Sequence, residues 1–532
     1  MSFRANKTQQ LAFNDSFFGL TGREKKALER SWAKVFAEDI FPNINEEPFN
    51  VLYSDKASRP NTPVNVIIGA LIIKELFGAS DDEIVDNLML DPRYQYALHT
   101  TSFEEQPLSD KSLSRFRMRC YEYERTHGVD LYRECIEGLS AHIAKLMNID
   151  GRIRRMDSTM IEANIRRLSR IELIYTCIAK LVKHLDKAGI EFDRERLEHY
   201  LDPEDYNKVI YHSRNEDVDE RMSVLLADAD ELIKLCDGQC EDATEYLLFS
   251  RCMSEQTIVD GGLRRLRNKE DGGMDSNMMQ NPSDPDATYR KKGSNVHRGY
   301  VANIEESVGS NGSVVTSYQF EKNNVSDSAM LKEHLENINS SEEILMTIDG
   351  AYASTENIEL AAGKNIELVP TDLVGRDTDS IMANFKFNED FTKVLECPAG
   401  HTPKSCSYNS RTEQCVLSFN RYLCANCPFH DQCNPKIYKR VAKKTVSRKS
   451  VARAEYLKTK DTDRFKLIVR LRNGVETVHS ILKNQYDVDR MPVRGLQRCK
   501  LFFGSKIGAL NFQKLFRFRN GTGNYAPNPI LG

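Results

Sequence analysis

The sequence predicts an α/β protein, in which an all-α N-terminal region precedes a mixed-sheet core that a helical insertion and a small Cys-rich insertion interrupt. Three observations predict this class. Residues 342–349, EEILMTID, form a continuous apolar run, which is typical of a strand buried on both faces. Residues 299–307 and 313–321 flank a turn at Gly309–Gly312, which predicts a hairpin. Residues 464–485 place apolar side chains at steps of three or four, which predicts one helix of about five turns.

The N-terminal region, residues 1–150, has helical patterns throughout. Pro63 begins an apolar helix that ends near Gly78, and Ser80 with Glu83 forms a capping box for the next helix. Two helices joined by a short turn suggest a helix-turn-helix, although a plain helical bundle explains the pattern as well. A third helix, expected from Ser109, favours DNA contact through its basic residues, which are Lys111, Arg115, Arg117 and Arg119.

The core elements follow in a definite order. A strand is expected to end at Asp157, with Asn164, Arg166 and Arg167 after it, and an acidic helical insertion without strand signals covers 168–280. After a loop-like stretch at 276–298, the hairpin is followed by a helix at 326–337 and by the buried strand that ends at Asp349. A helix at 351–362, a strand at 366–370 and the helix at 464–485 complete the order. This is the order of an RNase H-like fold, with both aspartates at strand ends where open α/β sheets bind ligands.

Charge is distributed unevenly along the chain. The net charge of -4 conceals 23 Lys+Arg against 6 Asp+Glu in residues 436–520, and 18 acids against 6 bases in 191–245. The basic segment requires a polyanion, an acidic partner within the chain, or both. Expected domain boundaries are 1–150, 151–375, 376–460 and 461–532.

The absence of long apolar runs predicts the location of the protein, and the cysteines predict its metal content. No apolar run is long enough for a membrane span and the N-terminus has no secretory signal, so we expect a cytoplasmic protein. Six of the thirteen cysteines lie between 397 and 433, and a signal-less chain uses such a cluster more often for a metal than for disulfides. The C-x2-C pair at 424–427 has the spacing of a zinc knuckle, with an unmetallated thiol cluster as the alternative.

The polar face of the helix at 464–485 carries the most specific pattern. Arg472, Glu476 and Lys483 line up there, which by itself fits a surface helix with an ion pair. The same spacing resembles the signature of the DDE transposases of bacterial insertion sequences. The resemblance covers DSTMIEAN at 157–164, DPDAT through GY at 284–300, DGAY at 349–352 and this helix, and it extends to LSDKSLSRFR at 108–117.

The resemblance implies a metal-dependent active site. The family's metal ligands correspond to Asp157, Asp349 and Glu476, which would hold two Mg²⁺ ions, with Mn²⁺ as a substitute. Arg472 and Lys483 correspond to residues thought to contact DNA near the reacting strand. Two departures are visible: Val469 replaces the usual tyrosine, which puts a hairpin intermediate in doubt, and the second block reads Asp-Gly-Ala-Tyr rather than Asp-x-Gly-Tyr.

The resemblance also implies a structural zinc. Related transposases carry a comparable cysteine arrangement, which selects Cys397, Cys424, Cys427 and Cys433 as ligands. Cys406 and Cys415 are then spare thiols, and His401 and His430 are rival ligands. The basic stretch beyond the knuckle predicts contacts to DNA phosphates, with Lys443, Lys444, Arg448 and Lys449 as candidates alongside Arg115, Arg117, Arg166 and Arg167.

The expected function is therefore DNA transposition. The chain would bind the terminal inverted repeats of its element, cut strands by metal-assisted hydrolysis, and join 3′-OH ends to target DNA, working at least as a dimer. Two rivals remain. An RNase H-like nuclease would cut without joining, and a transposase-derived DNA-binding protein would bind without cutting.

Overall fold

The computed structural model describes residues 1–6, 17, 19–54, 56, 59–100, 108–210, 218–338, 342–372, 379–460 and 462–523. The chain divides into two units. Unit 1 contains the described residues of Met1–Arg152, Asp157–Glu333 and Glu476–Tyr525, and unit 2 those of Ile153–Met156 and His334–Val475. Strand β1, Ile153–Glu162, therefore contributes its first four residues to unit 2 and the rest to unit 1.

The main sheet is mixed and has six strands. Its order is β4-β5-β1-β7-β8, with β6 also paired to β5. β5 is antiparallel to β4 and β6, whereas β7 is parallel to β1 and to β8. This agrees with the predicted α/β class. The strands not yet bounded are β4 (Thr288–Lys292), β5 (Asn295–Gly309), β6 (Gly312–Lys322), β7 (Ile344–Ile348) and β8 (Ile366–Pro370).

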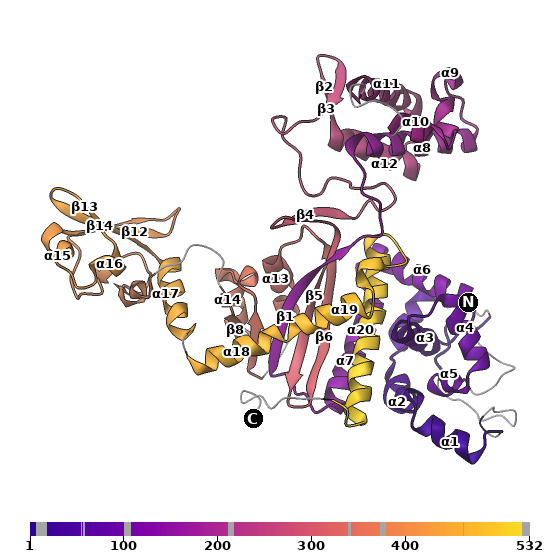
Figure 1. Cartoon of the computed structure of the whole chain (residues 1–532), viewed down its shortest axis with the longest axis horizontal. Coiled ribbons are helices and arrows are strands. Elements are labelled where there is room, and N and C mark those ends of the chain that lie inside the picture. Colours follow the sequence, from indigo (N-terminus) through magenta and orange to yellow (C-terminus); the bar gives the residue numbers. More distant parts are fainter. Residues whose placement is uncertain are drawn as a thin grey trace. The chain divides into compact units, whose positions relative to one another are not determined.

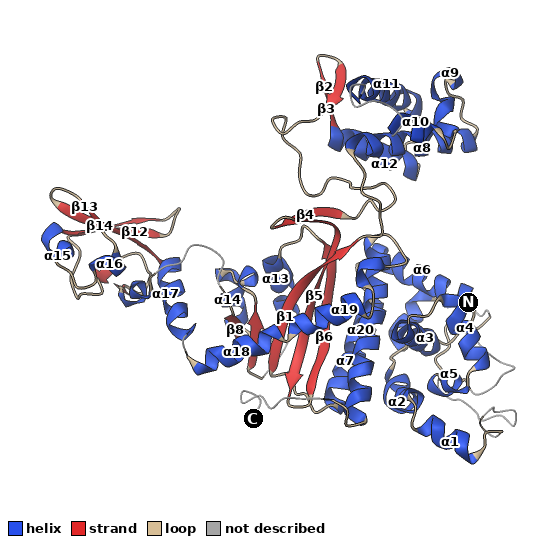
Figure 2. Cartoon of the chain, viewed as in Figure 1, coloured by secondary structure: helices blue, strands red, loops and turns tan. Residues whose placement is uncertain are grey.

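The N-terminal region of unit 1 is helical, as predicted (Figure 2). The Arg-rich helix α6 begins after Ser109, but a short helix, α5, intervenes between it and α4. Asp91 caps α5, and Pro92 occupies its first turn, where a missing N–H costs nothing. The helices are α1 (Gly22–Glu29), α2 (Trp32–Val35), α3 (Val64–Phe77), α4 (Asp81–Leu90), α5 (Pro92–Ala97), α6 (Asp110–His127) and α7 (Leu131–Leu146).

The pair α3–α4 forms through the local signals in the sequence. Gly78 ends α3 in the left-handed conformation, and the Ser80–Glu83 capping box begins α4 with both of its hydrogen bonds. Helix α3 is buried along most of its length. The exposed face of α4 carries acids, including Glu83, so this helix is poorly suited to approach DNA phosphates.

The acidic insertion of unit 1 has its own apolar core, to which Ile178, Leu225 and Phe249 contribute from three different helices. The insertion is mainly helical, as predicted. Its helices are α8 (Arg170–Ala188), α9 (Arg194–Leu197), α10 (Asp205–Ile210), α11 (Val218–Cys236) and α12 (Thr244–Gln256).

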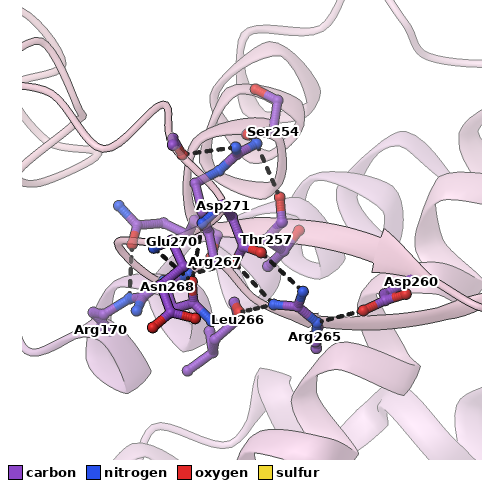
Figure 3. A network of polar contacts seen from close by, with 12 residues as sticks. Arg170, Ser254, Thr257, Asp260, Arg265, Leu266, Arg267, Asn268, Glu270 and Asp271 are labelled. Atoms are coloured by element: carbon purple, nitrogen blue, oxygen red, sulfur yellow. Dashed lines mark hydrogen bonds and ion pairs between the residues drawn. The ribbon is translucent and has the colours of Figure 1, made fainter.

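The expectation that the insertion lacks strands was wrong. β2 (Thr257–Asp260) and β3 (Leu263–Leu266) form a hairpin whose turn, Gly261–Gly262, has positive φ at both positions. Figure 3 shows the polar contacts of the hairpin and of the segment after it, in which Arg265 pairs with Asp271 at 2.8 Å and with Asp260 at 3.0 Å. The β-branched run before the two glycines was the sequence signal for this hairpin.

Other boundaries also differ from the predictions. β1 continues five residues past Asp157, β4 occupies part of the stretch predicted as loop, and α14 begins at Thr355 rather than at 351. The predicted single helix at 464–485 is two helices, α18 (Asp463–Asn473) and α19 (Val475–Asn484), divided at Gly474.

Helix α20, Leu496–Arg519, is the central buried helix of unit 1 and runs beside α7 and β6 (Figure 1). Asn511 on α20 donates to the carbonyl of Val315 at 2.8 Å and accepts from its N–H at 3.0 Å. Because Val315 lies in β6, this amide satisfies backbone groups that the sheet leaves unpaired. In the described part of the chain, none of the helices is long and apolar enough to cross a membrane.

Unit 2 contains the parallel strands and the Cys-rich segment. A second sheet, of order β11-β12-β14-β13, packs its inner face on a small core that includes Phe385, Leu417 and Val451. The elements are α14 (Thr355–Ala362), β9 (Lys386–Phe387), β10 (Val394–Glu396), β11 (Ser405–Asn409), β12 (Gln414–Asn420), α15 (Arg421–Ala425), α16 (His430–Cys433), β13 (Lys436–Ile437), β14 (Val441–Ser447) and α17 (Arg448–Lys460). Helix α13, Asp327–Asn337, lies at the junction of the two units in the sequence.

Candidate active site

Asp157 lies in the middle of β1, and its carboxylate is largely covered. The N–H of Ser158 donates to Oδ1 at 2.9 Å, and Nε2 of His479 lies 3.7 Å from Oδ2. The side chain is 13% exposed. A strand fixes the direction of each side chain, so Asp157 presents its carboxylate in a defined place.

Helix α19 carries Glu476 in its first turn. Val475, Val478 and Leu482 bury the apolar face of the helix, which leaves Glu476 exposed on the other face. A carboxylate in the first turn also interacts favourably with the helix dipole. Within unit 1, the contact between His479 and Asp157 places α19 beside β1, and Glu476 precedes His479 by one turn of the same helix.

His479 lies against Asp157, and the sequence analysis did not single it out. Its side chain is buried, and among the described residues neither ring nitrogen has a hydrogen-bond partner. Buried polar atoms of this kind call for an explanation such as a water or an ion. The signal in the sequence was its spacing of four from Val475, which puts this polar residue on the buried face of the helix.

Lys483 also reaches β1. Its ammonium donates to the carbonyl of Met160 at 2.7 Å and lies 3.1 Å from Asp489. The predicted DNA-contacting lysine is therefore held near the strand of Asp157, two turns along α19 from Glu476.

Unit 2 holds the second aspartate and the arginine of the signature. Asp349 follows β7 directly and is 43% exposed, and Nη2 of Arg472 on α18 lies 3.7 Å from its Oδ2. Arg155 in β1 donates to the carbonyl of Leu471 at 2.7 Å, close to the end of α18. The pairing of Arg472 with Asp349 puts a fixed positive charge beside a carboxylate that needs compensation.

The described residues do not form a complete metal-binding site. In the described ranges, no three His, Cys, Asp or Glu side chains are grouped closely enough to hold a metal ion. Of the three predicted metal ligands, Asp157 and Glu476 belong to unit 1 and Asp349 belongs to unit 2.

Two models of known protein families match this chain. A model described as transposase DDE domain matches residues 396–516, which include α18, α19 and α20. A second model, described as a transposase domain (DUF772), matches residues 26–119. The chain is a DDE transposase of an insertion sequence.

The other two comparisons add little to this identification. No curated protein matches the transposase. A solved structure described as a piggyBac transposase synaptic complex with hairpin DNA matches with 9% identity and a TM-score of 0.25, covering 94% of this chain and 86% of that chain. At that TM-score nothing about the fold follows from the match.

Four cysteines of unit 2 line one cavity in the transposase, although they are not grouped closely enough to form a metal site. Cys397, Cys424, Cys427 and Cys433, the predicted zinc ligands, line one cavity of about 30 Å³. Burial and the neighbouring thiols raise the pKa of Cys424 to about 11, and burial raises that of Cys433. These are the four cysteines selected from the resemblance.

The other cysteines and the two rival histidines differ in whether they reach this cavity. Cys406 and Cys415 contact each other on β11 and β12, where burial and the Cys406 thiol raise the pKa of Cys415 to about 11. His401 and His430 also line the four-cysteine cavity. One nitrogen of His430, Nδ1, lies 2.7 Å from the carbonyl of Cys424.

Lys444 lies at the same cavity rather than on the outer surface. Its ammonium donates to the carbonyl of Cys433, and burial lowers its pKa. Its neighbour Lys443 points the opposite way and is exposed, as alternation along β14 requires. Lys443 thus keeps a place among the candidate DNA contacts, and Lys444 is better explained by the cysteine cluster.

The other predicted DNA-contacting residues also separate by exposure. Arg117 is buried, pairs with Asp81 and lies over the ring of Phe502, so it stabilises the fold. Arg166 pairs with Glu172 at 2.9 Å. Arg448 lies 3.7 Å from Glu359, although both side chains are more than half exposed. Exposed positions are occupied by Arg115, Arg166, Arg167, Arg448 and Lys449.

The DPDAT block at 284–288 supports the start of α20. Asp286 accepts from the N–H of Leu496 at 3.2 Å, and buried Asp284 accepts from the hydroxyl of Tyr300 at 2.5 Å. Burial raises the pKa of Asp284. The block therefore positions α20 in the transposase and is separate from the three predicted metal ligands.

Proposed function

We propose that this transposase binds the terminal inverted repeats of its insertion sequence, cuts the DNA there, and joins the freed 3′-OH ends to target DNA. The observation that carries the proposal is the contact between Asp157 and His479, because it places the helix of Glu476 beside the strand of Asp157 within unit 1. Asp349, with Arg472 beside it, is the third member of the proposed site.

We assign the core to the RNase H-like class. The strand order β6-β5-β1-β7-β8 supports this, as do the antiparallel pairing of β5 with β6 and the parallel pairing of β1, β7 and β8. Asp349 directly follows β7, and Asp157 lies within β1, the strand that pairs with β7 in parallel.

The donor set fits magnesium. Asp157, Asp349 and Glu476 would hold two Mg²⁺ ions, since Mg²⁺ prefers carboxylate oxygens together with water and phosphate oxygens. The ions would supply charge stabilisation for the attacking and leaving oxygens of a phosphodiester. Mn²⁺ would fit the same oxygen ligands.

The protein's own residues orient these groups. Arg472 holds Asp349, and His479 lies against Asp157. In cleavage, a water oxygen bonds to phosphorus, the bond to the 3′ oxygen breaks, and the 3′ oxygen leaves as a hydroxyl. In joining, that hydroxyl attacks a target phosphodiester and displaces another 3′ oxygen. Holding two element ends together for this exchange calls for at least a dimer.

We also propose a structural zinc in the Cys-rich segment. Four thiols around one cavity of about 30 Å³ are a donor set suited to tetrahedral zinc. The segment has only a small apolar core, so a metal would add stability that packing alone does not supply.

Cleavage of a labelled duplex carrying the element's own end tests the proposal. We expect Glu476→Gln to bind the duplex normally and to cut it ~100-fold more slowly or not at all, because a metal ligand contributes several kcal/mol to the transition state. Asp463→Asn removes an exposed carboxylate from the neighbouring helix α18 and should leave cleavage unchanged.

The two rivals predict different results in the same assay. If the wild-type chain cuts the duplex but never joins ends to a target, the nuclease function replaces transposition. If the wild-type chain and the Glu476→Gln variant both bind and neither cuts at any metal or salt concentration, the chain is a DNA-binding protein.

A further inference from the structure

A second cavity in unit 1 lies where the C-terminal half of α6 meets the start of α20. It has a volume of about 310 Å³, and Tyr121 and Arg125 of α6 face Arg494 and Arg498 across it. We call it the arginine cavity. None of its residues is among the predicted site residues, and all belong to unit 1.

The charges of the arginine cavity are unbalanced. Among the described residues, no carboxylate pairs with Arg125 or Arg498, and both side chains are exposed. Glu122 and Asp286 also line the cavity, so its wall carries three guanidinium groups and two carboxylates, and Asp286 accepts from the N–H of Leu496. The guanidinium groups outnumber the carboxylates by one, so the wall of the cavity keeps a net positive charge that attracts an anion. The cavity therefore favours an anionic ligand.

The groups of the arginine cavity are held in place. Arg494 donates from Nε to the carbonyl of Asn164 at 2.7 Å, and the guanidinium of Arg498 lies 5.9 Å from the ring centroid of Tyr121. Buried Lys500 on α20 pairs with Glu124 on α6 at 2.9 Å and with Asp130 at 3.0 Å. These contacts fix α6 against α20, so the cavity is ready-formed for a ligand.

Helix α20 adds to the positive character of the arginine cavity. It begins at Leu496, on the cavity wall, so the positive end of its dipole lies there, where the carboxylate of Asp286 accepts from the N–H of Leu496. Guanidinium groups form paired hydrogen bonds with phosphate oxygens more readily than ammonium groups do. A phosphodiester is thus the anion that suits these groups best.

The location relates the arginine cavity to the proposed site. Asn164, which holds Arg494, is seven residues after Asp157 and directly beyond the end of β1. A DNA strand that reaches Asp157 along β1 would pass this point. A free phosphate would satisfy the charges as well, but the exposed rim suits a continuous backbone.

We infer that the arginine cavity binds a backbone phosphate of the DNA strand that is brought to Asp157. This inference rests on the proposed function, because it names a contact that the DNA of the proposed reaction would make. Arg494 and Arg498 would hold the phosphate oxygens, and Arg125 would add charge from α6.

The test measures binding of the full chain to a fluorescently labelled DNA duplex of arbitrary sequence over a series of salt concentrations. We expect Arg494→Ala with Arg498→Ala to weaken binding roughly tenfold at moderate salt and to reduce the slope of log K against log salt by ~1 for each lost contact. Arg498→Lys should keep the slope and lose part of the affinity, because the charge stays and the paired hydrogen bonds go.

Controls separate the arginine cavity from general charge. Lys183→Ala with Lys187→Ala removes two exposed cations from α8, and this variant should bind as the wild type does. Thermal unfolding of each variant checks that the fold is intact, and Arg498→Lys serves if the alanine variant does not fold.

Three results would contradict the inference or what it rests on. If the alanine variant binds the duplex with an unchanged slope, the arginine cavity is no DNA contact. If that variant loses binding of inorganic phosphate while duplex binding persists, the cavity is a site for a free anion, and the inference is again wrong. If the wild type binds no duplex, the proposed function itself fails.

Discussion

At the residue scale, the least expected feature is a buried histidine beside a predicted metal ligand. His479 lies 3.7 Å from Asp157, and neither of its ring nitrogens has a hydrogen-bond partner among the described residues. A purely structural histidine would satisfy at least one nitrogen. We therefore consider His479 a positioning residue, which would hold the Asp157 carboxylate through a water.

We predict that His479→Phe slows DNA cleavage by about 10–100-fold, in line with the loss of a group that orients a metal ligand. The Mg²⁺ concentration that gives half-maximal cleavage should rise, while affinity for the duplex stays the same. The measurement is a Mg²⁺ titration of cleavage, with Ser480→Ala on the exposed face of α19 as the control. An unchanged Mg²⁺ dependence in His479→Phe would assign the histidine to packing alone.

At the element scale, the division of α18 from α19 depends on one glycine. Gly474 has helical backbone angles, φ −61° and ψ −21°, so its conformation suits any residue. A Cβ at this position would lie 2.0 Å from Nη1 of Arg155. Arg155 is buried and donates to Leu471, so it cannot move away without losing a hydrogen bond. The glycine thus leaves room for the arginine that secures the end of α18.

We predict that Gly474→Ala destabilises unit 2 by about 1–3 kcal/mol, the usual cost of overpacking. Denaturant unfolding measures it. Gly363→Ala is the matched control, because its backbone is also helical and its Cβ would meet nothing closer than 3.5 Å. In the double variant with Arg155→Met the two effects should not add, since the clash disappears with the guanidinium. Additive effects would mean that Arg155 is not the cause.

At the scale of the whole molecule, local patterns predicted most elements, and long-range contacts explain the errors. The buried strand before Asp349 and the Ser80 capping box formed as expected, since their signals lie within a few residues. The single helix at 464–485 failed because its apolar period continues through Gly474, and only the distant Arg155 marks the break. The polar strand β4 has no apolar alternation to reveal it.

The candidate site residues also differ in how well the sequence predicted them. Sequence motifs alone were enough to select the three predicted metal ligands, Asp157, Asp349 and Glu476. The residue type alone does not tell whether a cation is exposed, so Arg117 and Lys444 were predicted to lie on the surface. Arg117 is instead buried in an ion pair with Asp81, and Lys444 lies at the cysteine cavity. Strand alternation from Ala442 to Val446 could have separated Lys444 from Lys443.

The four-cysteine cavity of unit 2 makes a testable prediction about metal content and stability. We predict that the purified chain contains zinc, and that a chelator lowers the thermal stability of the Cys-rich segment while the helices of unit 1 keep their own transition. Cys424→Ser with Cys427→Ser should abolish zinc binding, whereas Cys406→Ser with Cys415→Ser should preserve it, because only the first pair lines the cavity. Elemental analysis and calorimetry measure these outcomes.

The acid dependence of zinc binding follows from the thiols. Without metal, the pKa of Cys424 is raised to about 11, so this thiol is protonated at neutral pH and must release its proton to bind zinc. Zinc affinity should therefore fall as the pH falls. Lys444→Met should lower the affinity further, by about 10–100-fold, because it removes the cation beside Cys433. The same variant should leave the salt dependence of DNA binding unchanged, and a reduced salt slope would return Lys444 to the DNA-contacting residues.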